Sequence, residues 1–375
     1  MKKVVIAIDS FKGCLPSVEA GKAAAEGIRS VYPECEVICL PIADGGEGML
    51  DVLIMATNGQ EVPISAHDPL MRWRNTYYGI SENGETAFIE MASISGLPLV
   101  PPERRNPMLT TTYGTGEIIR DALERGCRNF IIGIGGSATN DAGLGMLQAL
   151  GFRFSDKEGK EVGTGRGEVL IKVAHIDSTC VHPALNSCRF TVACDVQNPF
   201  YGPEGAAYVF APQKGADREM VEALDAGLQN FAEVIRHTTG KDISHHPGAG
   251  AAGGMGGSLL AFLNAELKPG IQLILEALDF SNKIKSADLI ITGEGKADRQ
   301  TLMGKVPSGI LAEARKQNIP VILLAGNIED SDELQQAGFE GVFSVNPPFI
   351  SLEEAMRPEV ACKNIQQTVE SICKK

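Results

Sequence analysis

The sequence is poor in aromatic residues, in clustered positive charge and in long apolar runs. Phe, Trp and Tyr make up 6% of the 375 residues, too few for a surface that stacks single-stranded nucleic acid. The formal net charge is −13 and no long run of Lys or Arg occurs, which argues against non-specific binding to DNA or anionic membrane. No apolar stretch approaches the roughly 18 residues that cross a bilayer, and the run at residues 4–8 is too short for a signal peptide. We therefore expect a soluble, cytoplasmic protein without nucleic-acid or membrane partners.

The cysteines and histidines lack the spacing of a metal site. The nine Cys are an odd number, and pairs such as Cys35 and Cys39 are not CxxC motifs. A zinc site uses closer spacing and His partners. His245 and His246 are adjacent, but no third ligand follows at useful spacing. We expect reduced thiols, mostly buried, and surface histidines.

Neither common nucleotide-binding motif is present in its proper context. Every Gly-Lys pair lacks the Ser or Thr of a Walker A motif, so a kinase of this sequence would not be of the P-loop type. Gly248, Gly250 and Gly253 spell GxGxxG, but the preceding segment GKDISHHP is polar and ends in Pro, where a dinucleotide fold needs a strand.

Strand and helix patterns alternate at both ends of the chain but not in its middle. Residues 2–8 and 36–42 predict strands, residues 17–32 and 47–57 predict helices, and the alternation returns after about residue 285. Residues 61–99 show shorter strand-like runs that are typical of an antiparallel or mixed sheet. We expect an α/β protein: a Rossmann-like parallel-sheet domain of residues 1–60 and 285–375, an inserted mixed α/β domain of residues 61–284, and a cleft between them.

Acidic, small polar and glycine residues follow several of the predicted strands. The segments are DSFKG, ADGGEG, GGSATNDAG, CDVQNP and TGEGKAD. One such segment is ordinary turn or cap chemistry, because Asp and Asn hydrogen-bond their own backbone. Their repetition at strand ends, in a chain with 42 Gly, instead predicts a functional cleft. Acid-and-glycine loops suit a metal–phosphate site, since Mg²⁺ binds carboxylates together with phosphate oxygens and Gly lets backbone N–H groups approach phosphate.

Together these segments resemble the type 1 glycerate kinase family of bacteria. The resemblance rests on IAIDSFKG, PIADGGEG, GIGGSATNDAGLGMLQALG, ACDVQNPFYGPEGAAYVFAPQKGA, GAGAAGGMGG and ADLIITGEGKADRQTLMGKVP, which span nearly the whole chain in order. It implies two α/β domains and a non-P-loop kinase that phosphorylates D-glycerate with ATP and Mg²⁺, with 2-phosphoglycerate as the associated product. It leaves open whether the protein is a monomer or a homodimer.

Phosphoryl transfer needs alignment, a metal ion, cations on the transferring oxygens and a group that orients the hydroxyl. We expect Asp195 to orient or deprotonate the glycerate hydroxyl with help from Asn198, although both residues also fit turn chemistry. Lys12 and Arg299 lie beside strand ends and are candidate anion contacts, although lone surface cations are usually only solvated. The complete candidate set is Asp195, Asn198 and Lys12 for catalysis; Ser10, Asp44, Arg72 and Arg299 for the substrate; Asp44, Glu294 and Asp298 for Mg²⁺; and Gly135, Gly136, Ser137, Asn140, Gly253, Gly254, Gly256 and Gly257 for the nucleotide phosphates.

Three other functions fit parts of the sequence. A kinase could act at the other hydroxyl, giving 3-phosphoglycerate, or on another small hydroxy acid, since no side chain reveals the acceptor's size. An NAD-dependent dehydrogenase would require a strand before Gly248. A non-catalytic sugar-acid sensor would need a regulatory or DNA-binding segment with a basic helix, which the sequence lacks.

Overall fold

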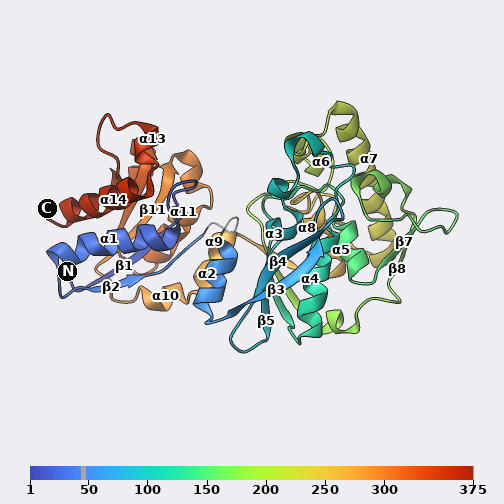
Figure 1. Cartoon of the computed structure of the whole chain (residues 1–375), viewed down its shortest axis with the longest axis horizontal. Coiled ribbons are helices and arrows are strands. Elements are labelled where there is room, and N and C mark those ends of the chain that lie inside the picture. The colour runs from blue at the N-terminus through green and yellow to red at the C-terminus, as the bar shows by residue number, and fades with distance from the viewer. Residues whose placement is uncertain (44–47, 375) are drawn as a thin grey trace. The chain divides into compact units, whose positions relative to one another are not determined.

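The structure is a computed structural model that describes residues 1–43 and 48–374. The chain divides into two compact units (Figure 1). Unit 1 consists of Met1–Asp44 and Ile271–Lys375, and unit 2 of Gly45–Gly270. Unit 1 is therefore built from both ends of the chain, and the blue N-terminal and the red C-terminal helices of Figure 1 both belong to it.

Unit 1 contains a fully parallel five-stranded sheet in the order β13-β12-β11-β1-β2. The first strand is buried along nearly its whole length, which explains its continuous apolar sequence KVVIAI. The strands are β1 (Lys3–Ile8), β2 (Glu36–Cys39), β11 (Leu289–Ala297), β12 (Val321–Ile328) and β13 (Gly341–Ser344).

The order of the strands reverses between β1 and β11. From β1 the chain passes through α1 to β2 on one side, whereas from β11 it passes through α11 to β12 and through α12 to β13 on the other. In open α/β sheets, ligands bind at such a reversal, outside the carboxyl ends of the strands. Asp9 follows β1 there, and Glu294 lies within β11 immediately after Gly293, the register partner of Ile8.

Helices cover this sheet, and small residues bring two of them close together. A Cβ on Gly27 of α1 would lie 2.6 Å from the carbonyl oxygen of Gln366 of α14, so Gly27 sets the approach of the two helices. The helices of unit 1 are α1 (Ser17–Val31), α9 (Gly270–Ala277, whose first residue belongs to unit 2), α10 (Phe280–Lys283), α11 (Val306–Arg315), α12 (Ser331–Gln336), α13 (Leu352–Ala355) and α14 (Pro358–Cys373), with the 3-10 turn η6 (Arg299–Leu302).

Unit 2 contains a mixed six-stranded sheet in the order β10-β9-β6-β5-β4-β3. Four strands are parallel, while β3 and β4 join antiparallel at one edge. The strands are β3 (Gln60–His67), β4 (Trp73–Ile80), β5 (Thr86–Glu90), β6 (Asn129–Gly133), β9 (Arg189–Ala193) and β10 (Glu266–Lys268); β7 (Arg153–Ser155) and β8 (His175–Asp177) pair separately. The predicted α/β class, with one parallel and one mixed sheet, is confirmed.

The longest helix of unit 2 has clear sequence signals at both ends. The carboxylate of Asp217 accepts a hydrogen bond from the backbone N–H of Met220 at 2.9 Å, and Gly240 ends the helix in the left-handed conformation. The helices of unit 2 are α2 (Met49–Ala56), α3 (Ala92–Ser95), α4 (Tyr113–Glu124), α5 (Leu144–Ala149), α6 (Ala206–Phe210), α7 (Arg218–Thr239) and α8 (Met255–Phe262), with the 3-10 turns η1 (Leu97–Leu99), η2 (Pro102–Arg104), η3 (Gly167–Lys172), η4 (Pro183–Ser187) and η5 (Pro212–Lys214).

The borders of the units differ from the domain borders expected at residues 60 and 285. Helix α2 belongs to unit 2 because its apolar side packs on β4, where a Cβ on Gly79 would lie 2.5 Å from Cγ1 of Ile54. Ile271 of α9 packs on Gly309 of α11 in the same way, within unit 1. The predicted discontinuous domain of residues 1–60 and 285–375, with residues 61–284 inserted, remains a prediction. No helix in the described part of the chain has the length and apolar character to span a membrane.

Candidate functional site

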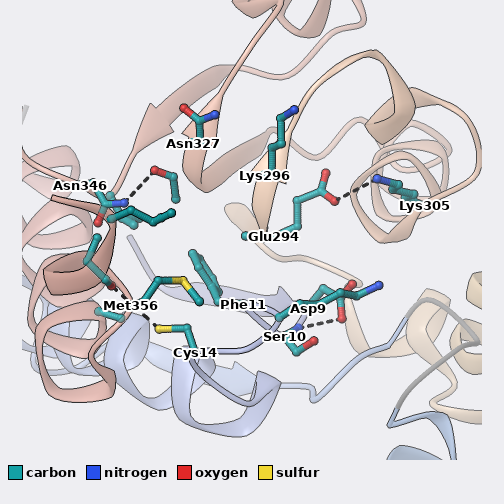
Figure 2. Close-up of a pocket in the computed structure, with 17 residues that line it drawn as sticks. Asp9, Ser10, Phe11, Cys14, Glu294, Lys296, Lys305, Asn327, Asn346 and Met356 are labelled. Carbon is teal, nitrogen blue, oxygen red and sulfur yellow. Dashed lines mark hydrogen bonds and ion pairs between the residues drawn. The ribbon is translucent and has the colours of Figure 1, made fainter. Parts of the chain in front are cut away.

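A cavity of about 340 Å³ lies in unit 1 at the carboxyl ends of its strands (Figure 2). It coincides with the reversal of strand order, where a ligand is expected. Its lining comes from the segments that follow β1 and β13, from the ends of β11 and β12, from the N-cap residue of α11 and from the region of the last two helices: Asp9, Ser10, Phe11, Lys12, Cys14, Glu294, Gly295, Lys296, Lys305, Gly326, Asn327, Val345, Asn346, Leu352, Ala355, Met356 and Ala361.

Glu294 is the least satisfied polar group of this cavity. Its side chain is almost completely buried, and Oε1 has no hydrogen-bond partner among the described residues. Oε2 lies 4.0 Å from Nζ of Lys305, too far for a hydrogen bond. Burial raises the pKa of the Glu294 carboxyl. Because a buried oxygen without a donor is costly, Glu294 is suited to receive a cation or a donor from a ligand.

A second acid and two flanking residues lie across the cavity from Glu294. Asp9 is 5% exposed, and its Oδ1 accepts a hydrogen bond from the backbone N–H of Ser10 at 2.7 Å. The backbone N–H of Asp9 donates to the carbonyl of Gly293, which joins the ends of β1 and β11. Figure 2 shows Asp9 and Ser10 on one side of the cavity and Glu294 with Lys305 on another. Lys12, which follows the same strand, is exposed and also lines the cavity.

The other end of the cavity is apolar. Phe11 and Val345 are buried there, and Leu352 and Met356 approach from α13 and the residue after it, both partly open to solvent. Burial raises the pKa of the nearby Cys14 thiol, and its Sγ lies 3.9 Å from the carbonyl of Ala355. The cavity therefore combines a charged end with an apolar end.

Unit 2 carries a buried polar cluster in the loop after β6. Nζ of Lys214 donates to Oγ of Ser137 at 2.8 Å and to the carbonyl of Thr139 at 2.6 Å. Lys214 is only 2% exposed, and burial lowers its pKa to about 7. The side chain of Asn140 is fully buried, and both of its polar atoms lack a partner among the described residues. Asp141 accepts hydrogen bonds from the backbone N–H and the hydroxyl of Thr112, both at 2.8 Å.

The two glycine-rich segments expected to hold nucleotide phosphates pack against one another. A Cβ on Gly253 would lie 2.1 Å from the carbonyl oxygen of Thr139, and the backbone N–H of Ala142 donates to the carbonyl of Gly253 at 3.0 Å. Gly254, Gly256 and Gly257 are buried as well, whereas Gly135 and Gly136 are exposed. The close approach of two backbones is therefore one reason for the glycines in this region. Turns, and no strand, fill the described residues 244–254 around Gly248, which removes the basis for a dinucleotide site there.

Asp195 and Asn198 follow β9, as expected, in unit 2. Asp195 is exposed, and its Oδ1 accepts a hydrogen bond from the backbone N–H of Gly270, the first residue of α9, at 2.9 Å. The side chain of Asn198 donates to the carbonyl of Glu204 at 2.8 Å. Both residues thus make local bonds that would also suit a structural role.

The other predicted charged residues lie outside the cavity lining. Arg299 is exposed and forms ion pairs with Glu333 and with Asp330. Arg72, in unit 2, pairs with Asp68 at 2.7 Å. Asp298 caps η6, its carboxylate accepting from the backbone N–H of Gln300 at 2.8 Å. The predicted metal and substrate residue Asp44 lies outside the described residues.

Three charged groups of the cavity lining and the buried Lys214 were not among the candidate residues, and they differ in how visible they are in the sequence. Asp9, Lys296 and Lys305 stand in segments already singled out, DSFKG and TGEGKADRQTLMGK, so their places after predicted strands were a usable signal. Lys214, in APQKGA, carries no such signal in the sequence, because its burial depends on contacts with a loop far away along the chain.

The metal-binding capacity of the described residues is limited. No group of three or more His, Cys, Asp and Glu side chains in residues 1–43 and 48–374 could hold a metal ion. Mg²⁺ needs fewer protein ligands, because it takes one or two carboxylates and completes its shell with phosphate and water. The unpartnered Oε1 of Glu294 fits that kind of site.

Comparison with known proteins gives matches over nearly the whole chain. The model of the "Glycerate kinase family" matches residues 4–375. Glycerate 2-kinase of Escherichia coli (strain K12) is 48% identical over 356 residues, which are 95% of this chain and 93% of the relative. Glycerate kinase of Bacillus subtilis (strain 168) is 46% identical over 371 residues, 99% of this chain and 96% of the relative. A crystal structure of a candidate glycerate kinase 2 from Salmonella typhimurium LT2 has a TM-score of 0.90 and 44% identity, covering 100% of this chain and 97% of that one.

Proposed function

The chain belongs to the glycerate kinase family, and we propose that it transfers the γ-phosphate of ATP to a hydroxyl of D-glycerate and releases 2-phosphoglycerate. The observation that carries this proposal is the family match over residues 4–375, together with 48% identity to a glycerate 2-kinase. The cavity at the strand reversal supports it, since it joins acids and lysines as a metal–phosphate site would.

Glu294 is the residue that we propose for Mg²⁺, through the carboxylate oxygen that has no partner among the described residues. The bound ion would neutralise charge on the phosphate oxygens. Asp44 and Asp298 remain candidate ligands from the sequence. Asp298 would have to serve while its carboxylate caps η6.

Lys12 and Lys305 would contact the anionic oxygens of the reactants. Both line the cavity, and the 4.0 Å between Lys305 and Glu294 leaves room for a ligand atom to bridge the two charges. Ser10 would donate its hydroxyl from the same segment as Lys12. Such positioning and charge stabilisation account for most of what a protein contributes to phosphoryl transfer.

Asp195 would orient or deprotonate the reacting hydroxyl, with Asn198 beside it. Exposure of Asp195 at the end of β9 is compatible with this role, and its bond to the backbone of Gly270 would fix the direction of the carboxylate. The alternative is a purely structural bond between Asp195 and the backbone of Gly270, and it predicts that Asp195→Asn lowers stability and not the rate.

The roles of the remaining candidates stay predictions, and the contacts of these residues weigh against some of them. Arg72 and Arg299 would have to exchange a carboxylate partner for the substrate. The exposed Gly135 and Gly136 are better placed to offer backbone N–H groups to phosphate than the buried Gly253, Gly254, Gly256 and Gly257. Cytoplasmic location and a monomeric or dimeric state likewise remain predictions.

The decisive experiment is ³¹P NMR of the purified protein with Mg-ATP and D-glycerate. A new phosphomonoester signal that grows together with ADP establishes the kinase. Its coupling to one proton identifies the 2-phosphate, whereas coupling to two identifies the 3-phosphate. Intact ATP and no new signal would remove glycerate as the acceptor, and other small hydroxy acids would then be compared under the same conditions.

A further inference from the structure

We propose that the cavity of unit 1 binds the phosphoryl donor, with the purine base at its apolar end and the phosphate chain at its charged end. This inference rests on the proposed kinase function and goes further by assigning the cavity to the nucleotide and not to the acceptor acid. It also differs from the sequence-based prediction, which placed the phosphates on the glycine-rich loops of unit 2.

The first argument is the mismatch between the apolar wall and a small hydroxy acid. Every carbon of glycerate carries oxygen, so burying it against Phe11, Val345 and Met356 would remove hydration and return no hydrophobic gain. A purine has apolar faces and a polar edge, which is the shape that small-molecule pockets with mostly apolar linings accept. The cavity volume of about 340 Å³ also lies in the range of sites for molecules larger than glycerate.

The second argument is that part of this wall is still exposed. Leu352 is 77% and Met356 38% exposed, although both line the cavity. They belong to a short ordered segment, because Oγ of Ser351 accepts a hydrogen bond from the backbone N–H of Glu354 at 3.2 Å. Covering two exposed apolar side chains at the opening of a cavity with a flat apolar ligand removes them from water and so favours binding.

The third argument is the charge at the opposite end. Lys12, Lys296 and Lys305 outnumber the acids Asp9 and Glu294 in the lining of one cavity, in a chain whose net charge is −13. Lys296 pairs with Glu329 at 3.0 Å and with Asp298 at 3.5 Å, so it would have to exchange a carboxylate for a phosphate. Several lysines around one space suit a chain of phosphates, which carries more negative charge than a single carboxylate.

The polar edge of a base would meet amides between the two ends. The side chain of Asn346 is committed, since it donates to the carbonyl of Gly326 at 2.8 Å and accepts from Asn364 at 3.2 Å. Asn327 is exposed and has only a 3.5 Å contact with Glu329, so its amide can turn towards a ligand. We therefore assign the base edge to Asn327.

A direct test follows the ¹³C-labelled methyl group of Met356 in the full-length protein by NMR, with the variant Met356→Leu to identify its signal. Mg-ADP brings an aromatic ring next to this methyl and should shift its resonance, whereas Mg-tripolyphosphate, which has no base, should leave it unchanged. Met220 on α7 in unit 2 serves as the matched methyl that responds to neither. A Met356 signal that ignores Mg-ADP at saturation would overturn the assignment.

A second test uses Leu352→Asp, with Ile171→Asp as the matched change of an exposed aliphatic residue in unit 2. Leu352→Asp should weaken Mg-ADP binding at least tenfold by calorimetry and leave the affinity for Mg-tripolyphosphate within twofold. The KM for D-glycerate should also stay within twofold. A raised KM for glycerate with unchanged nucleotide affinity would give the cavity to the acceptor instead.

The two proposals fail in different ways. If product forms in the ³¹P experiment but Mg-ADP neither shifts Met356 nor binds less tightly to Leu352→Asp, the kinase stands and the cavity assignment falls. If Mg-ADP shifts Met356 and no hydroxy acid is phosphorylated, the nucleotide site stands and the proposed reaction falls.

Discussion

Nζ of Lys214 lies 2.8 Å from Oγ of Ser137, and both side chains are almost completely buried. This contact fixes the loop after β6 through a residue far along the chain. The same ammonium group donates to the carbonyl of Thr139, so one side chain satisfies two acceptors of this loop. The side chain of the next residue, Asn140, has no hydrogen-bond partner among the described residues. The stability of this loop should therefore depend on the protonation of a single lysine.

The stability of the wild-type protein relative to Lys214→Met should rise with pH between about 7 and 9. Burial lowers the folded-state pKa of Lys214 to about 7, from 10.5 in the reference state. In this window the unfolded chain binds a proton that the folded chain does not, so the free energy of unfolding increases by up to about 1.4 kcal/mol per pH unit. Below pH 7 the difference between the two proteins should be flat. Urea unfolding at half-unit steps of pH measures it, and an unchanged difference from pH 7 to 9 would show that Lys214 titrates normally.

Glu294→Gln should abolish most activity without loss of stability. Removing the carboxylate that we propose for Mg²⁺ should lower kcat about 100-fold or more. The variant should be at least as stable as the wild type at pH 7, because a buried carboxylate oxygen without a partner is replaced by a neutral amide. Since the folded pKa of Glu294 is raised, that gain should shrink as the pH falls towards 4.5. Glu313→Gln on α11 is the control; equal activity in both variants would remove Glu294 from the site.

Asp195→Asn separates catalysis from turn formation. The amide keeps an oxygen that can accept from the backbone of Gly270, so the melting temperature should change little while kcat falls about 100-fold or more. Asp242→Asn is the control, because Asp242 accepts a local backbone bond from Ser244 in the same unit. A lowered melting temperature with an unchanged rate would return Asp195 to a structural role.

Gly253→Ala should destabilise the protein far more than Gly240→Ala. Both glycines have positive φ, +67° and +75°, and the left-handed conformation alone costs a side chain about 1–2 kcal/mol. At Gly240 nothing lies within 4 Å of the added Cβ, whereas at Gly253 the carbonyl oxygen of Thr139 lies at 2.1 Å. Chemical unfolding should therefore show at least 2 kcal/mol of extra loss for Gly253→Ala. Similar losses in both variants would mean that the loop after β6 moves away easily.

Lys305→Ala should lower activity strongly, whereas Arg299→Ala should change it little. Lys305 lines the cavity opposite Glu294, so its loss should raise the KM for ATP about tenfold or more. Arg299 is 65% exposed and paired with surface acids, so its loss should change kcat and KM by less than about threefold. Steady-state kinetics of both variants, with ATP and glycerate varied, measure these effects. A large effect of Arg299→Ala would favour the role predicted for Arg299 from its sequence position.

The sequence was sufficient for the parts of this fold that depend on local pattern. The continuous apolar runs at the start of the chain and after residue 285 marked buried parallel strands, and the shorter strand-like runs of residues 61–99 marked the mixed sheet. Because parallel strands end at a common edge, Ser10, Lys12 and Glu294 could be expected near one another, and all three line one cavity.

What the sequence could not reveal depends on contacts between distant segments. Arg299 pairs with Glu333, and Gly253 packs on Thr139; neither partner can be identified from spacing along the chain. The glycine-rich segments have the composition of a phosphate loop, but the same composition also allows two backbones to touch. Lys214 was missed for the same reason, since a lysine in a polar stretch is normally exposed.

The pairing of β1 with β11 has a consequence for how the protein is made. Val4 is synthesised long before Leu289, its partner in β11. At about 5–20 residues per second, the ribosome reaches Leu289 roughly 15–60 s later. Unit 2 lies entirely between them in the sequence and can fold during this interval, while the apolar KVVIAI segment has only β2 as a sheet partner and its β11 edge stays open. One edge of β1 is thus open while the chain is being made, and production of this protein should be sensitive to chaperones that hold such edges.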